Sequence, residues 1–479
     1  MELKRKAIIG LSWSFLDNFV GQTISVIVGI VLARLLSPAE FGVLGIIIFF
    51  TVIFGSFVDS GFGSALIRKK DCSQTDCSTV FIFNLVVSIF LYGLLYLMAP
   101  FAEYFFNEPG LTAILRVAGV VLVINAISAV QHTLMVKRID FKTKTKISVT
   151  SDTLAGVIAI IMAYNGFGVW SLVWRNVLGN SFAAIMLWLL NSWRPTSVFS
   201  LKSFRELFGF GYKLALSGLI DTIYRNIYYP IIQKVFSSAT LGFYTIAEKY
   251  TNLFSSTLTS IIQRVSFPVL STVQDDTDQL RWGFHKILIS TMMITFALML
   301  GLAAVAKPLI VILIGEEWLP CVLYLQLMCF STMLYPLQAM NLNIITISGR
   351  SDLFLKLEII KKTINIPLIF VGIYLGVEAL LIGAFICSII SCFLNTHYSA
   401  KLMDFSAKDQ LISILPFFAV SLIVSLLVWS ITCLQWNNWA TLILQVVTGV
   451  ALTIGTYEVM KQENYLEMKE IVLRAITKK

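Results

Sequence analysis

The amino-acid sequence predicts an all-α integral membrane protein with about 14 transmembrane helices, arranged as two pseudo-symmetric six-helix lobes followed by a C-terminal helix pair. Three observations support this fold class: the composition, the length of the apolar runs, and a turn sequence that occurs twice. Of the 479 residues, 57% are hydrophobic and only 13% are charged. Soluble domains carry about 25% charged residues, so this composition indicates a chain that lies in a lipid bilayer.

The apolar runs are continuous and about 20 residues long, which is the length of a helix that crosses the hydrocarbon core. Strands of a membrane β-barrel would instead alternate apolar and polar residues over about ten positions. We therefore predict helices. The segments with this character are residues 9–31, 42–65, 79–99, 111–135, 149–164, 168–190, 214–232, 242–262, 287–306, 321–347, 355–375, 379–399, 410–432 and 439–458.

The distribution of basic residues predicts the orientation, because Lys and Arg concentrate in the cytoplasmic loops of membrane proteins. With a cytoplasmic N-terminus, 29 of the 36 Lys and Arg residues fall in the inner loops and termini. Only Arg34, Lys234 and Lys307 fall in the outer loops. This asymmetry predicts that both termini face the cytoplasm.

The repeated turn predicts the lobes. Residues 32–46 read "LARLLSPAEFGVLGI", and residues 232–246 read "IQKVFSSATLGFYTI", with Ser, Ala, Gly and Ile at matching positions. Each copy follows the first helix of a six-helix unit. Because six is an even number, both units have the same orientation, which predicts an axis along the membrane normal and a cavity between the lobes. The predicted domains are an N-terminal lobe (1–205), a C-terminal lobe (206–405), and an extra helix pair with a cytoplasmic tail (406–479).

Charged residues inside the predicted spans are candidate functional residues, because a charge in hydrocarbon needs a cavity or a partner. The predicted orientation places the basic ones deeper from the cytoplasm than the acidic ones. A guanidinium or ammonium group in a dry cavity suits a phosphate group, which Arg holds through two hydrogen bonds. The basic candidates for binding are Arg225, Lys249, Arg175 and Arg116, and the acidic candidates for coupling or gating are Asp17, Asp59, Asp152 and Asp221.

Structural roles are the alternative for several of these residues. Asp221 and Arg225 are spaced i, i+4, so they could simply neutralise each other. Asp152 and Arg116 lie near helix ends and could reach the membrane interface.

Other classes of site lack a sequence signal. The chain contains no G-x-x-x-x-G-K-[ST] motif, so we predict no P-loop nucleotide site. Its three histidines are scattered, and its seven cysteines show no metal-ligand spacing. We predict no metal, no cofactor and no catalytic residue. The net charge of +9 lies in the inner loops, so we expect no nucleic-acid partner.

Several segments carry a family resemblance. "GLSWSFLDNF" at residues 10–19, "LARLLSPAEFGVLGI" at 32–46, "FVDSGFGSALIRKKD" at 57–71, "LGFYTIAEKY" at 241–250 and "QRVSFPVLSTVQDD" at 263–276 resemble Wzx-type polysaccharide flippases. Flippases of this type export units of lipopolysaccharide O-antigen, colanic acid and teichuronic acid. They belong to the multidrug/oligosaccharidyl-lipid/polysaccharide exporter superfamily. The resemblance covers nearly the whole chain. The final helix pair departs from many members, which have twelve helices.

The resemblance implies a transporter rather than an enzyme. Its substrate would be an oligosaccharide linked to undecaprenyl diphosphate, moved from the cytoplasmic to the outer leaflet of the bacterial inner membrane by alternating access of two lobes. Cavities of the family are cationic, which fits Arg225 and Lys249 receiving the diphosphate. The implied partners are this lipid-linked oligosaccharide, membrane lipids and a polysaccharide polymerase. The alternatives are a multidrug or organic-cation antiporter of the same superfamily and a membrane glycan polymerase, which would need a larger outer loop.

Overall fold

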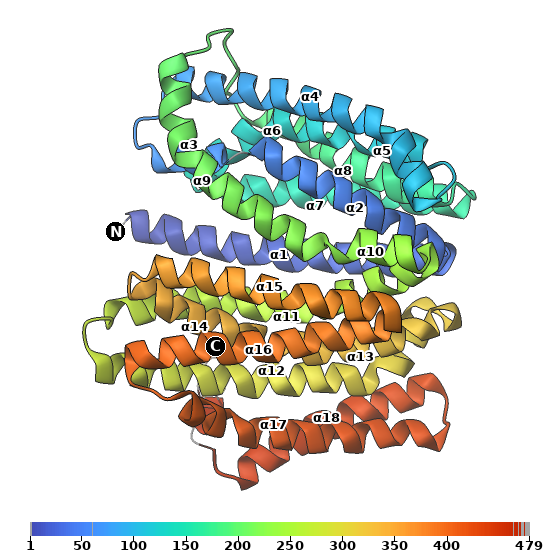
Figure 1. Ribbon diagram of the computed structural model, residues 1–479, viewed down its shortest axis with the longest axis vertical. Helices are drawn as coiled ribbons and strands as arrows, with labels where there is room; N and C mark the ends of the chain where they lie inside the picture. The colour runs from blue at the N-terminus through green and yellow to red at the C-terminus, as the bar shows by residue number, and fades with distance from the viewer. Residues whose placement is uncertain (1, 60, 463, 468, 471–473, 475–479) are drawn as a thin grey trace. The chain divides into compact units, whose positions relative to one another are not determined.

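The structure is a computed structural model that describes residues 2–59, 61–462, 464–467, 469–470 and 474. These residues form helices and connecting loops with no β-strand among them, which confirms the predicted all-α class (Figure 1). The helices are α1 (Glu2–Leu35), α2 (Pro38–Asp59), α3 (Phe62–Arg68), α4 (Gln74–Phe106), α5 (Leu111–Ala118), α6 (Val120–Lys137), α7 (Phe141–Tyr164), α8 (Val169–Leu190), α9 (Leu201–Asn226), α10 (Tyr228–Val235), α11 (Ser238–Thr272), α12 (Thr277–Ile314), α13 (Leu319–Thr332), α14 (Tyr335–Ile347), α15 (Ser351–Leu375), α16 (Val377–Met403), α17 (Ala407–Ser430) and α18 (Asn438–Val459), with short 3₁₀ helices at Glu316–Trp318 and Ile431–Leu434.

The chain divides into two compact units, Met1–Gly242 and Phe243–Lys479. The first unit holds α1 to α10 and the first turn of α11, and the second unit holds the remainder. The predicted boundary after residue 205 separates the two copies of the sequence repeat, not two compact units, and it stays a prediction.

Eleven helical segments in the described part of the chain are long and apolar enough to cross a membrane. The protein is therefore a multi-pass membrane protein. The other three predicted spans, 214–232, 242–262 and 355–375, coincide with residues of α9 and α10, α11, and α15. Charged and polar side chains lower the hydropathy of these helices, so the number fourteen stays a prediction.

The side chains of α4 are distributed as a bilayer requires. Asn84 and Ser88, one helical turn apart, are buried inside the first unit. Val86, Phe90 and Leu97 are 61%, 69% and 77% exposed. Lipid tails are as apolar as these side chains, so the exposed face of α4 is suited to lipid rather than to water.

The same order of helix packing occurs within each unit. In the first unit α4 packs on α5 and α6, α6 packs on α8, and α7 packs on α8. In the second unit α12 packs on α13, α14 packs on α16, and α15 packs on α16. A break divides the fourth span of each copy, at Gly119 and near Met333. This agreement supports the inference that the sequence contains one helical unit twice.

The second copy of the repeated turn is fixed to the end of α4. The backbone N–H of Thr240 donates to Ser237 Oγ at 3.1 Å, which begins α11. The carboxylate of Glu108 accepts hydrogen bonds from Ser238 Oγ and from Gln233 Nε2, the latter at 3.0 Å. Glu108 belongs to the loop between α4 and α5, so side chains of this loop hold the repeated turn.

The C-terminal helix pair belongs to the second unit. Both α17 and α18 pack on α12, and they also pack on each other. Gln445 Nε2 donates to the Val428 carbonyl at 3.0 Å and to Thr432 Oγ1 at 2.9 Å. Amide side chains that bond across helices stabilise such packing in lipid.

Candidate functional site

A chain of polar and charged side chains runs through the first unit where α7 packs between α1 and α8. Lys144, Ser148 and Asp152 are spaced four residues apart, so they form one stripe along α7. Lys144 Nζ lies 3.7 Å from Asp17 Oδ2 on α1. Ser148 Oγ donates a hydrogen bond to Asp17 Oδ1. One candidate carboxylate, Asp17, is therefore held by two partners from α7.

The row of polar side chains continues onto α8. Asp152 lies within electrostatic range of both the Arg175 guanidinium and the Asp17 carboxylate. Arg175 Nη2 donates to Ser25 Oγ on α1 at 3.4 Å. Three of the predicted residues, Asp17, Asp152 and Arg175, thus belong to one network.

This network has balanced charge, with two bases (Lys144 and Arg175) and two carboxylates (Asp17 and Asp152). Pairing reduces the large cost of placing charges in a membrane interior. Carboxylates that share hydroxyl and basic partners are also the groups used for proton relays in membrane transporters. The sequence analysis did not identify Ser148, Ser25 or Lys144 as candidate site residues. The spacing of four residues along α7 was the signal that could have found the stripe.

Arg225 and Asp221 form a separate pair on α9. Arg225 Nε lies 2.7 Å from Asp221 Oδ2, which is the i, i+4 pairing that the spacing predicted as an alternative. The Arg225 side chain is 76% exposed. The guanidinium therefore keeps donors that Asp221 does not occupy. Helix α9 packs mainly on α2, α3 and α4 of the first unit.

The remaining predicted residues lie elsewhere. Arg116 stacks over the Tyr96 ring at 4.0 Å and donates from Nε to the Tyr96 carbonyl at 3.4 Å, so its contacts join α5 to α4. Half-buried Lys249 lies on α11 in the second unit. The side chain of Asp59, at the end of α2, lies outside the described residues.

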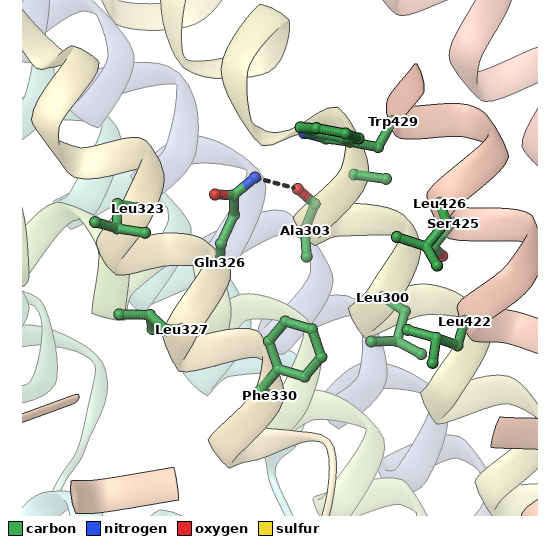
Figure 2. A pocket seen from close by; sticks show the side chains of 11 residues that line it. Leu300, Ala303, Leu323, Gln326, Leu327, Phe330, Leu422, Ser425, Leu426 and Trp429 are labelled. Atoms are coloured by element: carbon green, nitrogen blue, oxygen red, sulfur yellow. Dashed lines mark hydrogen bonds between the residues drawn. The ribbon is translucent and has the colours of Figure 1, made fainter. Parts of the chain in front are cut away.

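An apolar cavity of about 360 Å³ lies in the second unit between α12, α13 and α17. Figure 2 shows Phe330 and Leu300 at one end and Trp429 at the other. Gln326 Nε2 donates to the Ala303 carbonyl at 3.0 Å, so the amide is engaged by the cavity wall. The lining is suited to a hydrocarbon chain and lacks a charged side chain.

Comparison with known proteins shows the family of the chain. The family described as "Polysaccharide biosynthesis protein" matches residues 31–323. The chain belongs to this family. The match confirms the resemblance that the sequence motifs indicated.

Individual proteins extend the similarity along the chain. "Uncharacterized membrane protein in cps region" of Klebsiella pneumoniae is 25% identical over 100% of both chains. "Lipopolysaccharide biosynthesis protein WzxC" of Escherichia coli (strain K12) is 25% identical over 87% of this chain and 86% of its own. The solved structure "Lipid II flippase MurJ, inward closed conformation" has a TM-score of 0.73 and 16% identity, and the match covers 95% of this chain and 100% of that chain. At this identity the structural match establishes the fold.

The division of each unit into the same helix order gives two similar frameworks, one of which carries Asp17, Asp152 and Arg175. The described network contains hydroxyl, carboxylate and basic groups.

Proposed function

We propose that the protein is a flippase that moves an undecaprenyl diphosphate-linked oligosaccharide from the cytoplasmic to the outer leaflet of the bacterial inner membrane. The observation that supports this most strongly is family membership over residues 31–323 in a multi-pass membrane protein. A relative that covers most of the chain acts in lipopolysaccharide biosynthesis by its name. The product would serve lipopolysaccharide, capsule or exopolysaccharide synthesis.

The physical task is to move a polar glycan and a diphosphate across about 30 Å of hydrocarbon. In our proposal the two repeated lobes alternate in exposing a shielded path, and the prenyl chain stays in lipid. Arg225 is the first diphosphate ligand because its side chain is 76% exposed and only one edge pairs with Asp221. Lys249, Arg175 and Arg116 are the further basic ligands. The polar chain of Asp17 and Asp152 couples the movement to a proton or a cation.

The proposal makes the protein a transporter and not an enzyme. Both termini face the cytoplasm in the inner membrane, in agreement with the distribution of Lys and Arg. A polysaccharide polymerase that uses the flipped unit is the proposed protein partner. Its reaction would follow transport on the outer side.

Depletion of the protein from its host cell tests the function. Lipid extracts are analysed by mass spectrometry for polyprenyl diphosphate-linked oligosaccharide, and surface polysaccharide is measured in the same cultures. We expect the lipid-linked unit to accumulate while surface glycan falls, and the mass of the unit identifies the substrate.

The leaflet that holds the accumulated unit separates the proposal from polymerisation. A membrane-impermeant glycan-modifying enzyme applied to spheroplasts should leave the accumulated unit intact, because the unit is trapped on the inner side. Accumulation on the outer side would instead indicate a polymerase. Unchanged levels of both lipid-linked unit and surface glycan, in a strain without a second exporter, would favour an organic-cation antiporter.

A further inference from the structure

An open hollow of about 470 Å³, with both polar and apolar lining residues, lies in the second unit. None of the residues discussed above lines it. Its walls come from α11 and α14. The lining residues are Ser260, Gln263, Arg264, Phe267, Pro268 and Asn343.

The spacing of the α11 residues explains how they share this hollow. Ser260, Gln263, Arg264 and Phe267 stand at i, i+3, i+4 and i+7, which places them on one face of the helix. Asn343 approaches from α14 and donates from Nδ2 to Ser266 Oγ at 3.3 Å. The hollow is therefore built from two packed helices rather than from a loop.

Arg264 gives the hollow its charge. No acidic residue is among the lining residues. Across the part of the chain that the structure describes, the Arg264 guanidinium has no hydrogen bond, ion pair or ring contact with another side chain. By contrast, Arg225 pairs with Asp221, and Arg350 pairs with Asp352 at 2.9 Å. The donors of Arg264 are thus available to an anion.

Pro268 adds a second feature to the same hollow. Proline has no backbone N–H, so the carbonyl of Arg264, four residues earlier in α11, receives no helical hydrogen bond from it. One backbone acceptor of α11, the Arg264 carbonyl, therefore lacks its helical donor, and the same residue carries the guanidinium donors. A phosphate group linked to a hydroxyl-bearing sugar matches both, since phosphate accepts and hydroxyl donates.

The position along α11 sets the depth. Arg264 lies 26 residues after Ser238, which is about 39 Å of helix at 1.5 Å per residue. The hydrocarbon core is about 30 Å thick. With the outer end of α11 at the outer interface, Arg264 lies at the level of the phosphate groups of the inner leaflet.

We propose that Arg264, with Ser260, Gln263 and Asn343, forms a binding site for a lipid-borne phosphate group at the cytoplasmic end of α11. Its volume is within the range of about 300–1,000 Å³ that is usual for small-molecule sites. The inference rests on the proposed function for the orientation of α11. The phosphate comes from one of two sources, the polyprenyl diphosphate substrate or an ordinary phospholipid of the inner leaflet.

Binding measurements on purified full-length protein in detergent test this site. The probes are undecaprenyl diphosphate without sugar and phosphatidylglycerol, each titrated and followed by native mass spectrometry. Arg264→Gln should raise the dissociation constant for undecaprenyl diphosphate at least tenfold. Arg264→Lys should raise it by a smaller factor, because an ammonium group lacks the planar pair of donors.

Arg281→Gln is the matched control, because Arg281 lies on α12 beyond the hollow and contacts the Phe405 ring at 5.5 Å. It should leave both dissociation constants within about twofold of wild type. Size-exclusion profiles and thermal unfolding midpoints show whether each variant is folded. If Arg264→Gln does not fold, Arg264→Lys and Gln263→Ala carry the same comparison.

The two probes distinguish the sources. Loss of undecaprenyl diphosphate binding alone supports the site and assigns it to the substrate. Equal loss of both lipids supports the site and assigns it to inner-leaflet phospholipid. Unchanged binding of both lipids in folded Arg264→Gln and Arg264→Lys overturns the site. That result leaves the flippase proposal intact, because the depletion experiment does not involve Arg264.

Discussion

Gly42 lies against the backbone of Ser238, so closely that a methyl group added at Gly42 would come within 1.8 Å of the Ser238 carbonyl oxygen. The relationship is reciprocal. A methyl group added at Gly242 would come within 1.8 Å of the Pro38 carbonyl oxygen. Pro38 and Ser238 are themselves 200 residues apart, as are the two glycines. The repeated turns therefore touch each other through matching positions inside the first unit.

This contact predicts that Gly42→Ala and Gly242→Ala each destabilise the protein. The neighbouring atom is backbone and cannot rotate away, so we expect a loss of about 1–3 kcal/mol, as for overpacked positions. Thermal and denaturant unfolding in detergent measure the change. Gly301→Ala is the control, because Gly301 lies within α12 and no atom comes within 4 Å of an added methyl group. A control that loses as much stability as Gly42→Ala would contradict the close contact as the cause.

The network of Asp17, Asp152 and Arg175 predicts energetic coupling between Arg175 and Asp152. Arg175→Gln leaves the Asp152 carboxylate without its basic neighbour, so we expect a loss of about 1–3 kcal/mol in the free energy of unfolding. Asp152→Asn in the same chain should recover part of that loss. A double-mutant cycle on purified protein measures the coupling, which is about 0.5–3 kcal/mol for residues in one network. Strictly additive single effects would show that the two charges do not interact.

Substitution of Arg225 is predicted to affect export but not stability. Its pair with Asp221 is exposed and of the i, i+4 kind, and such pairs contribute about 0.3–0.5 kcal/mol. Arg225→Ala should therefore leave the unfolding midpoint nearly unchanged and reduce surface polysaccharide several-fold. Lys202→Ala, on the first turn of the same helix, is the control. Normal export with a normal protein level in Arg225→Ala would remove Arg225 from the proposed diphosphate ligands.

Cys72 is predicted to be a reactive thiol. Cys72 and Cys77 have their sulfur atoms 3.3 Å apart, in the loop between α3 and α4 and the first turn of α4. The hydrogen bond from the Cys77 thiol is the main cause that lowers the pKa of Cys72 to about 7, and the charges of Lys137 and Lys69 lower it further. The thiolate, which is the nucleophile, should therefore be half-formed near neutral pH.

Alkylation rates across pH 5 to 9 measure this property, in a Cys433→Ser background because Cys433 is the exposed thiol. Cys77→Ala should move the midpoint upward, toward the ordinary value of about 8.5. The sign for stability follows from the lowered pKa. The contribution of the Cys72 thiolate is complete above the ordinary value and is lost as the pH falls through about 7. If Cys77→Ala leaves the pH midpoint of alkylation unchanged, the hydrogen bond is not the cause of the lowered pKa of Cys72.

Hydropathy predicted much of the fold because membrane helices satisfy their backbone groups internally. Every predicted apolar segment lies mostly in helix among the described residues, including 214–232 and 355–375, which the charge of α9 and α15 makes less apolar. The breaks in α5–α6 and α13–α14 were not predicted, since Gly119 and Met333 stand within continuous apolar runs. The sequence shows that Gly42 and Gly242 occupy matching positions of a repeat, but it does not show that the two turns contact each other.

By itself, the sequence determined the helical class, the membrane setting and the twofold internal repeat, because composition, run length and recurrence are local properties. Only the tertiary structure decided which charges meet. Asp17, Asp152 and Arg175 come from three helices and join through packing of α7 on α1 and α8, whereas Arg116 turns to Tyr96. Spacing along one helix fixes neighbours at i+3 and i+4. Partners more than a hundred residues away depend on which helix faces pack together, and that is decided by the whole set of interhelical contacts.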